Sequence, residues 1–208
     1  MNKKVAIIDY GINNISSIFK IFQKIEIDAH IINEQEKLDN YKYIILPGVG
    51  SFDYGMKSLE TKGFQDKILK LSKKGYFILG ICLGMQLLLQ KSEESENETM
   101  GLSIFKGECK KIKSSGDRSI MSPHIGWNNL EIKKECQLIE NLENNFEGYF
   151  VHSYYADLEE RNQIITTTQH GVEFPSIIKK ENIYGIQCHP EKCSKNGIEI
   201  LKNFVNLN

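Results

Sequence analysis

The segment Tyr76-Phe77-Ile78-Leu79-Gly80-Ile81-Cys82-Leu83-Gly84-Met85-Gln86 contains the change of pattern that decides the fold. It opens with a continuous apolar run, which is typical of a strand buried on both faces of a parallel sheet. A helix is predicted directly after it, from Met85 to Gln90. A buried strand that turns at once into a helix indicates an α/β protein with a mainly parallel sheet.

The same alternation extends along both sides of this segment. Upstream, strands are predicted at 5–8, 29–32 and 43–46, and helices at 15–25 and 64–73. From 106 to 151 the pattern changes to short strand-like pieces, followed by strand candidates at 164–168, 175–178 and 183–187 and a last helix near 198–205. We expect a mainly parallel central sheet flanked by helices, with an antiparallel elaboration, in a single domain spanning 1–208.

Composition excludes several classes of protein. The 208 residues carry 26 Lys and Arg against 27 Asp and Glu, so the net charge of −1 disfavours a nucleic-acid protein held by a basic face. No apolar run reaches the roughly 18 residues that span a bilayer, and no signal core is visible. Five scattered cysteines support neither a disulfide scaffold nor a zinc ribbon. We therefore expect a cytoplasmic chain with reduced thiols.

Cys82 is the cysteine whose context indicates chemistry. Residues 80–84 have the form G-x-C-x-G between strand and helix, which is the nucleophile-elbow pattern with cysteine in place of serine. The glycines allow a sharp turn that presents the thiol at the carboxyl end of the sheet, where α/β proteins bind ligands. The helix N-terminus favours a thiolate, and the Leu83 amide is placed to stabilise an oxyanion. The alternative is a small buried cysteine at a tight turn.

A base and a group that orients it are predicted near the end of the chain. His189-Pro190-Glu191 directly follows the strand candidate at 183–187, so His189 sits at a strand end and Glu191 could hold its imidazole. Cys188 and Cys193 crowd beside them, but this spacing matches no common metal site, and no metal is expected. The other histidines are interpreted as structural or solvated: His30, His124, His152 and His170.

Two glycines flank Val49 in the segment Pro47-Gly48-Val49-Gly50, which ends the third predicted strand. Glycines at such a position allow backbone N–H groups to approach a ligand or to change orientation. Two interpretations stay open from these residues alone. The segment supplies the second half of an oxyanion hole, or it is an ordinary tight turn.

Taken together, the motifs resemble those of the class I (triad) glutamine amidotransferases, and within them the glutaminase subunits of imidazole glycerol phosphate synthases. The resemblance spans essentially the whole chain, and its motifs come in the family's order. The most specific are Pro-His-Ile-Gly-Trp-Asn and Tyr-Phe-Val-His-Ser-Tyr. The matching segments are 47–50, 80–86, 123–128, 149–154 and 189–192.

This resemblance implies a flavodoxin-like fold, no cofactor, and a definite role for each matching residue. Cys82 attacks the side-chain amide of glutamine, His189 transfers protons, and Glu191 orients His189. The amides of Val49 and Leu83 form the oxyanion hole. Substrate glutamine is bound by Gly48, Gly50, Gln86, Glu94, His152, Ser153 and Tyr154, and the partner is met by Trp127, Asn128 and Lys192.

The implied partner is a (β/α)₈ cyclase subunit, which receives the ammonia through a channel and makes imidazole glycerol phosphate and an aminoimidazole carboxamide ribotide in histidine biosynthesis. The tail of the chain also resembles a paralogous group that feeds ammonia to a sugar-modifying synthetase in surface-polysaccharide pathways. A stand-alone cysteine hydrolase and an inactive scaffold subunit are further alternatives. Cys188 and Cys193 depart from the family, which usually has an aromatic residue and a serine there.

Overall fold

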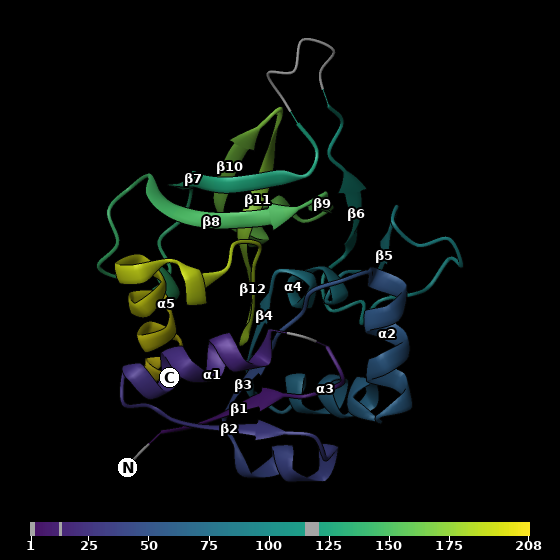
Figure 1. Ribbon diagram of the computed structural model, residues 1–208, viewed down its shortest axis with the longest axis vertical. Coiled ribbons are helices and arrows are strands. Elements are labelled where there is room, and N and C mark those ends of the chain that lie inside the picture. The colour runs from purple at the N-terminus through teal and green to yellow at the C-terminus, as the bar shows by residue number, and fades with distance from the viewer. Residues whose placement is uncertain (1–2, 13, 115–120) are drawn as a thin grey trace.

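A nine-stranded mixed sheet is the framework of the molecule. The computed structural model describes residues 3–12, 14–114 and 121–208, and its sheet has the order β2-β1-β3-β4-β12-β11-β10-β7-β8 (Figure 1). The parallel part contains β2 (Asp28–Ile32), β1 (Lys4–Ile8), β3 (Tyr43–Leu46), β4 (Phe77–Ile81) and β12 (Ile183–Ile186). The antiparallel part adds β11 (Val172–Lys180), β10 (Ile164–His170), β7 (His124–Ile132) and β8 (Phe146–His152). The predicted α/β architecture with an antiparallel elaboration is confirmed.

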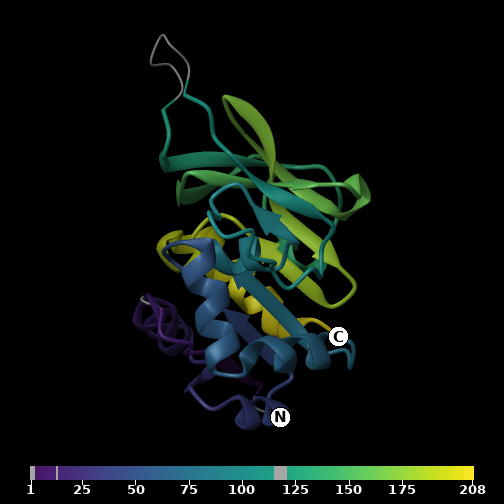
Figure 2. The same ribbon diagram turned by 90° about the vertical axis from the view of Figure 1, so that its right-hand side faces the viewer.

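Helices cover both faces of the parallel part. Apolar residues of α1 (Ile15–Lys24) and α5 (Ser194–Asn206) pack on one face, and those of α2 (Phe52–Thr61) and α3 (Phe64–Ser72) pack on the other. The central strands β3 and β4 between them are fully buried, which explains their continuous apolar runs. Figure 2 shows the helical layers at one end of the molecule and the antiparallel strands at the other. Short 3₁₀ helices lie at Gln35–Asn40, Gln137–Ile139, Arg161–Gln163 and Pro190–Lys192.

The sequence interpretation missed α2 and misplaced the start of α4 (Leu83–Leu87), which begins directly after Cys82. The buried residues of α2 are Phe52, Gly55, Met56 and Leu59, a spacing that suits one helix face. One of these core positions is a glycine, because a side chain there would meet Leu87 at 3.1 Å. The apolar pattern of α2 was therefore too weak to predict the helix, although its packing against Leu87 leaves little room for a side chain at Gly55.

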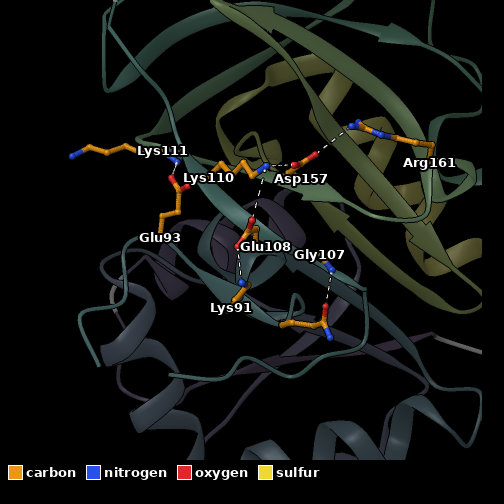
Figure 3. Close-up of polar contacts among 9 residues, drawn as sticks. Lys91, Glu93, Gly107, Glu108, Lys110, Lys111, Asp157 and Arg161 are labelled. Carbon is orange, nitrogen blue, oxygen red and sulfur yellow. Dashed lines mark hydrogen bonds and ion pairs between the residues drawn. The ribbon is translucent and has the colours of Figure 1, made fainter. Parts of the chain in front are cut away.

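A small second sheet joins the two parts of the molecule. It has the order β5 (Lys91–Ser92), β6 (Gly107–Lys111) and β9 (Tyr154–Leu158), and β9 follows β8 closely along the chain. Charged side chains alternate in sign across it (Figure 3). Lys110 Nζ lies 2.6 Å from Asp157, which Arg161 contacts at 3.3 Å, and Lys91 contacts Glu108 at 3.1 Å. Exposed pairs contribute only about 0.2–1 kcal/mol each, so this network adds little to stability.

The described part of the chain has no helix long and apolar enough to cross a membrane. Within the same residues, no group of three or more His, Cys, Asp or Glu side chains is arranged to hold a metal ion.

Candidate active site

Cys82 lies on a strained turn between β4 and α4. Its φ of 54° and ψ of −110° are unusual for a residue with a side chain, and its N–H donates to Ile186 O at 2.8 Å. A Cβ on Gly84 would lie 1.9 Å from Leu46 O, and one on Gly80 would lie 2.6 Å from Gly84 O. The positive-φ conformation of Cys82 costs on the order of 1–3 kcal/mol and persists only when the surroundings impose it. Both glycines of the elbow therefore allow close backbone contact, as the motif predicted.

His189 is held by a buried carboxylate. Its Nδ1 donates to Glu191 Oε1 at 2.8 Å, and both side chains are at most 1% exposed. Asn14 Nδ2 donates to the same carboxylate oxygen at 2.6 Å. The sequence interpretation gave Asn14 no role, although its position in the loop after β1 places it at the carboxyl edge of the sheet. Its positive φ of 87° is a conformation that asparagine tolerates better than most residues.

The electrostatics of His189 favour a charged imidazole. Burial lowers its pKa, but the facing Cys82 sulfur and the Glu191 carboxylate outweigh this effect and raise the pKa of His189 from 6.5 to about 10. The Nε2 atom is buried and makes no well-aligned hydrogen bond to a described residue. A proton at Nε2 is thus available on the side of Cys82, as general acid catalysis requires.

Two glutamine side chains connect Cys82 to the far wall of the site. Gln187 Nε2 lies 3.8 Å from Cys82 Sγ, and Gln86 Nε2 lies 3.2 Å from Gln187 Oε1. Gln86 also donates to Tyr154 O at 2.8 Å. Sequence reasoning missed Gln187, whose only signal was its place at the end of a strand, two residues before His189. Together, Gln86 and Gln187 fix the position of the Cys82 sulfur relative to Tyr154, the first residue of β9.

A cavity of about 380 Å³ opens over Cys82. This volume falls in the range of roughly 300–1,000 Å³ that is usual for small-molecule sites. Pro123 and Val151 line it although sequence reasoning had not selected them for a role. The structure brings together nine of the predicted residues in its lining: Val49, Gly50, Cys82, Leu83, Gln86, Glu94, His152, Ser153 and Tyr154.

Gly48 is the predicted substrate residue that does not line this cavity. It packs behind the cavity instead, because a Cβ there would lie 2.8 Å from both Gly84 N and Leu83 Cβ. The loop is anchored by Tyr10, whose buried hydroxyl donates to Pro47 O at 2.6 Å. Burial, aided by nearby Cys82, raises the pKa of Tyr10, so the hydroxyl keeps its proton. Tyr10 is a further residue that sequence reasoning left without a role.

Glu94 lies at the edge of the cavity and caps α2. Its Oε2 accepts the N–H of Phe52 at 2.8 Å, and Ser92 Oγ accepts the N–H of Glu94 at 3.1 Å. Burial raises the pKa of Glu94, and the hydrogen bond from Phe52 partly offsets that rise. The polar segment that looked like a loop therefore places one carboxylate firmly beside the cavity.

Trp127 and Lys192 meet on one exposed surface, but Asn128 does not join them. Trp127 is 54% exposed and packs edge-on against Tyr149, with ring centroids 5.6 Å apart, while Lys192 Nζ lies 4.8 Å from the Tyr149 ring centre. Ile125 and Val151 extend this surface as cross-strand partners. We call Ile125, Trp127, Tyr149 and Val151 the β7–β8 face. Asn128 points to the other face of β7 and donates to His124 and Gln169.

The remaining cysteines are buried or half-buried and act as packing residues. Cys193 accepts the N–H of Tyr149 at 3.1 Å and donates to His189 O at 3.0 Å. The neighbouring Cys193 thiol, together with burial, holds the pKa of Cys188 well above its usual value. Burial likewise raises the pKa of Cys109. These thiols support the His189 loop and the core rather than the cavity.

Comparison with known proteins assigns the class. Residues 6–207 match the family described as glutamine amidotransferase class-I, and the chain belongs to this family. Solved structures agree on the fold: PurLQS from Thermotoga maritima has a TM-score of 0.75 at 17% identity and covers 99% of each chain. A structure described as glutamine amidotransferase has a TM-score of 0.74 at 17% identity and covers 97% of each chain.

Curated relatives narrow the assignment within the family. A protein from Caldanaerobacter subterraneus is 40% identical over 200 residues, covering 96% of each chain. One from Pyrococcus furiosus is 42% identical over 205 residues, covering 98% of this chain and 99% of its own. Both are named imidazole glycerol phosphate synthase subunit HisH. The resemblance inferred from the motifs is thereby confirmed.

Proposed function

We propose that this chain is the glutaminase subunit of an imidazole glycerol phosphate synthase. It hydrolyses glutamine to glutamate and ammonia, and the ammonia serves histidine biosynthesis. The observation that carries the chemistry is that Cys82 lines a cavity of about 380 Å³ and faces the imidazole of His189, which Glu191 holds at 2.8 Å. The relatives described above all carry the name of this synthase, which favours it over the surface-polysaccharide alternative.

The geometry supports a two-step mechanism. The Cys82 sulfur attacks the side-chain carbonyl carbon of glutamine, and the oxyanion is stabilised by the backbone N–H groups of Leu83 and Val49. As the C–N bond breaks, His189 gives its Nε2 proton to the leaving amine, which departs as ammonia. Water then attacks the γ-glutamyl thioester while His189 takes one of its protons, so glutamate leaves and the Cys82 thiolate is restored beside a protonated His189. Glu191 keeps the imidazole oriented throughout.

The cavity lining suits an amino acid with an amide side chain. Glu94 offers a carboxylate to the substrate ammonium, and Gln86 offers an amide beside the reacting group. The backbone of Ser153, with its neighbours His152 and Tyr154, forms the opposite wall. The chemistry uses only these side chains and backbone amides, so no cofactor or metal is expected.

The β7–β8 face is the proposed docking surface for a (β/α)₈ cyclase subunit. Val151 belongs to this face and also lines the cavity, so a partner seated here lies close to the released ammonia. Trp127 offers an exposed aromatic anchor, and Lys192 adds a charge over Tyr149. Ammonia that stays in a closed path remains unprotonated, whereas in bulk water it becomes ammonium and loses its nucleophilicity. Residues 1–208 act as one domain, and we place the heterodimer in the cytoplasm.

Glutamate release with and without the cyclase subunit tests the proposal. We expect release by the wild-type complex and none above background for Cys82→Ala. Equal activity with and without the partner would instead indicate a stand-alone hydrolase. No release by the wild-type complex would leave an inactive scaffold subunit as the better interpretation.

A further inference from the structure

A line of hydrogen bonds between histidines leads from β7 to the wall of the cavity. His124 on β7 and His152 on β8 are cross-strand partners, and these two strands lie side by side in Figure 1. His124 Nδ1 lies 3.0 Å from His152 Nε2. Asn128 Nδ2 lies 3.1 Å from His124 Nε2 at one end, and His152 Nδ1 lies 2.9 Å from Tyr154 O at the other. The active-site chemistry described above uses neither imidazole.

Backbone groups fix the outer end of this line. Asn128 Oδ1 accepts the N–H of Asn129 at 2.8 Å, and Asn128 Nδ2 donates to Gln169 O at 3.0 Å. These two backbone partners settle which side-chain atom of Asn128 is nitrogen. Asn128 therefore donates to His124, and His124 Nε2 must be an acceptor without a proton.

A backbone carbonyl fixes the inner end. Tyr154 O can only accept, so the proton of His152 is on Nδ1 and its Nε2 is an acceptor. His124 must then donate from Nδ1, which agrees with the assignment from the outer end. Both imidazoles are thus Nδ1–H tautomers, and no alternative satisfies every partner with uncharged rings.

The surroundings keep the pair uncharged and rigid. Burial lowers the pKa of His124 to about 4 and that of His152 to about 3. The ring of His124 stacks between Phe150, at a centroid distance of 4.8 Å, and His170, at 4.0 Å. Packing therefore limits the movement of the donor and acceptor atoms.

The carbonyl at the inner end also holds the substrate side of the cavity. Tyr154 O accepts from Gln86 Nε2 at 2.8 Å as well as from His152. Gln86 in turn contacts Gln187, which approaches the Cys82 sulfur. A displacement of Tyr154 O therefore changes the position of Gln86 and the cavity wall together.

We propose that His124 is a positioning residue for the substrate cavity, acting through His152 to hold the Tyr154 carbonyl and with it the side chain of Gln86. Asn128 is the anchor of His124 and not a contact of the partner subunit. The assignment of glutamine as the substrate rests on the proposed function, whereas the hydrogen-bond directions do not.

The tautomers can be measured without any activity. Long-range ¹H–¹⁵N NMR spectra of the ¹⁵N-histidine-labelled chain at neutral pH should show Nδ1–H tautomers for His124 and His152. An Nε2–H tautomer, or a doubly protonated ring, at either position would overturn the proposal. This result stands or falls separately from the glutaminase assignment.

Kinetics of the complex with the cyclase subunit test the positioning role. His124→Phe keeps the stacked ring and removes both hydrogen bonds, so we expect the KM for glutamine to rise about tenfold with a much smaller change in kcat. His124→Asn should recover part of the loss, because its Nδ2 can donate where Nδ1 did. His170→Phe is the matched control, since its ring stacks on His124 but lies outside the line of bonds.

A purely structural role gives a different result. His124→Phe would then lower the melting temperature and the amount of active enzyme while the KM stays unchanged, and that outcome would overturn the proposal. An equal rise of KM in His170→Phe would overturn it too. If His124→Phe does not fold, the KM for glutamine is compared in His124→Asn and Asn128→Leu instead. An unchanged KM in both of these variants would count against the proposal.

Discussion

The side-chain amide of Asn14 lies 2.6 Å from Oε1 of Glu191, 177 positions away in the chain. The same oxygen accepts from His189 Nδ1 at 2.8 Å. Asn14 thus extends the pair His189–Glu191 by one further group and fixes the carboxylate that orients the imidazole. Supporting groups of this kind set how accurately a catalytic base is held.

Replacing Asn14 tests this relationship. Asn14→Asp places a second carboxylate against Glu191, and two like charges at this separation cannot both stay ionised. We expect kcat for glutamate release to fall at least about tenfold, because Glu191 then orients His189 poorly. Asn14→Gly is the control for the backbone, since glycine also accepts the positive φ and removes only one hydrogen bond. A fall for Asn14→Asp no larger than that for Asn14→Gly would contradict the argument.

The backbone conformation of Cys82 is predicted to lower the stability of the fold. Its φ of 54° with ψ of −110° is a glycine-like conformation, so Cys82→Gly should raise the free energy of unfolding by about 1 kcal/mol while abolishing glutamate release. Cys82→Ala retains a Cβ and should bring no such gain. Urea unfolding of the three proteins measures the difference, and a Gly variant no more stable than the Ala variant would show that the turn is not strained.

Gly84 is expected to be intolerant of any side chain. A Cβ there would lie 1.9 Å from Leu46 O, and neither backbone can move without opening the sheet. We predict that Gly84→Ala lowers the free energy of unfolding by at least about 3 kcal/mol. Gly75→Ala is a suitable comparison, because Gly75 has a φ of +79° but nothing within 4 Å of the added atom. It should cost only about 1 kcal/mol from backbone strain.

The raised pKa of His189 makes stability fall at alkaline pH. Its pKa is about 10 in the fold against an ordinary value of 6.5, so between these values the native state binds a proton that the unfolded state lacks. This contribution is complete below pH 6.5 and is lost as the pH rises through about 10, with a slope of at most about 1.4 kcal/mol per pH unit. Unfolding of wild type and His189→Gln from neutral to alkaline pH should therefore show a steeper decline for wild type. Parallel curves would refute this assignment.

Thiol labelling distinguishes Cys82 from the other cysteines. Because Cys82 alone among the five lines the cavity, a glutamine-mimicking electrophile should modify this thiol first. Peptide mass spectrometry after limited labelling identifies the site. Excess glutamine should slow the reaction, and preferential modification of Cys188 or Cys193 would count against the site.

The proposed docking surface is tested by comparing one variant on the β7–β8 face with one at the opposite end of the main sheet. Trp127→Ala on the β7–β8 face should weaken binding of the cyclase subunit by about 2 kcal/mol, or roughly 30-fold in Kd. Ile31→Ala removes an exposed apolar side chain from β2, at the opposite edge of the same sheet, and should leave Kd unchanged. Titration calorimetry measures both, and equal effects would place the partner elsewhere.

Local sequence was sufficient for much of this protein. Continuous apolar runs predicted the parallel strands, because a strand buried on both faces can carry little else. The two glycines around Cys82 predicted the turn, since no larger residue fits there. His189 and Glu191 are only two residues apart, so their spacing alone indicated the contact that the structure places at 2.8 Å. The helix α2 was missed because packing against Leu87 requires a glycine in its apolar face.

Tertiary structure alone decided which distant residues meet. The register pairs Ile81 of β4 with Ile186 of β12, so the segments that follow these two strands, which carry Cys82 and His189, reach the same edge of the sheet. The contacts of Asn14 and of His124 depend likewise on strand order and cross-strand register, which no short segment encodes. The sequence by itself therefore determined the elements and the reactive groups. The pairing of the strands determined the distances on which their chemistry depends.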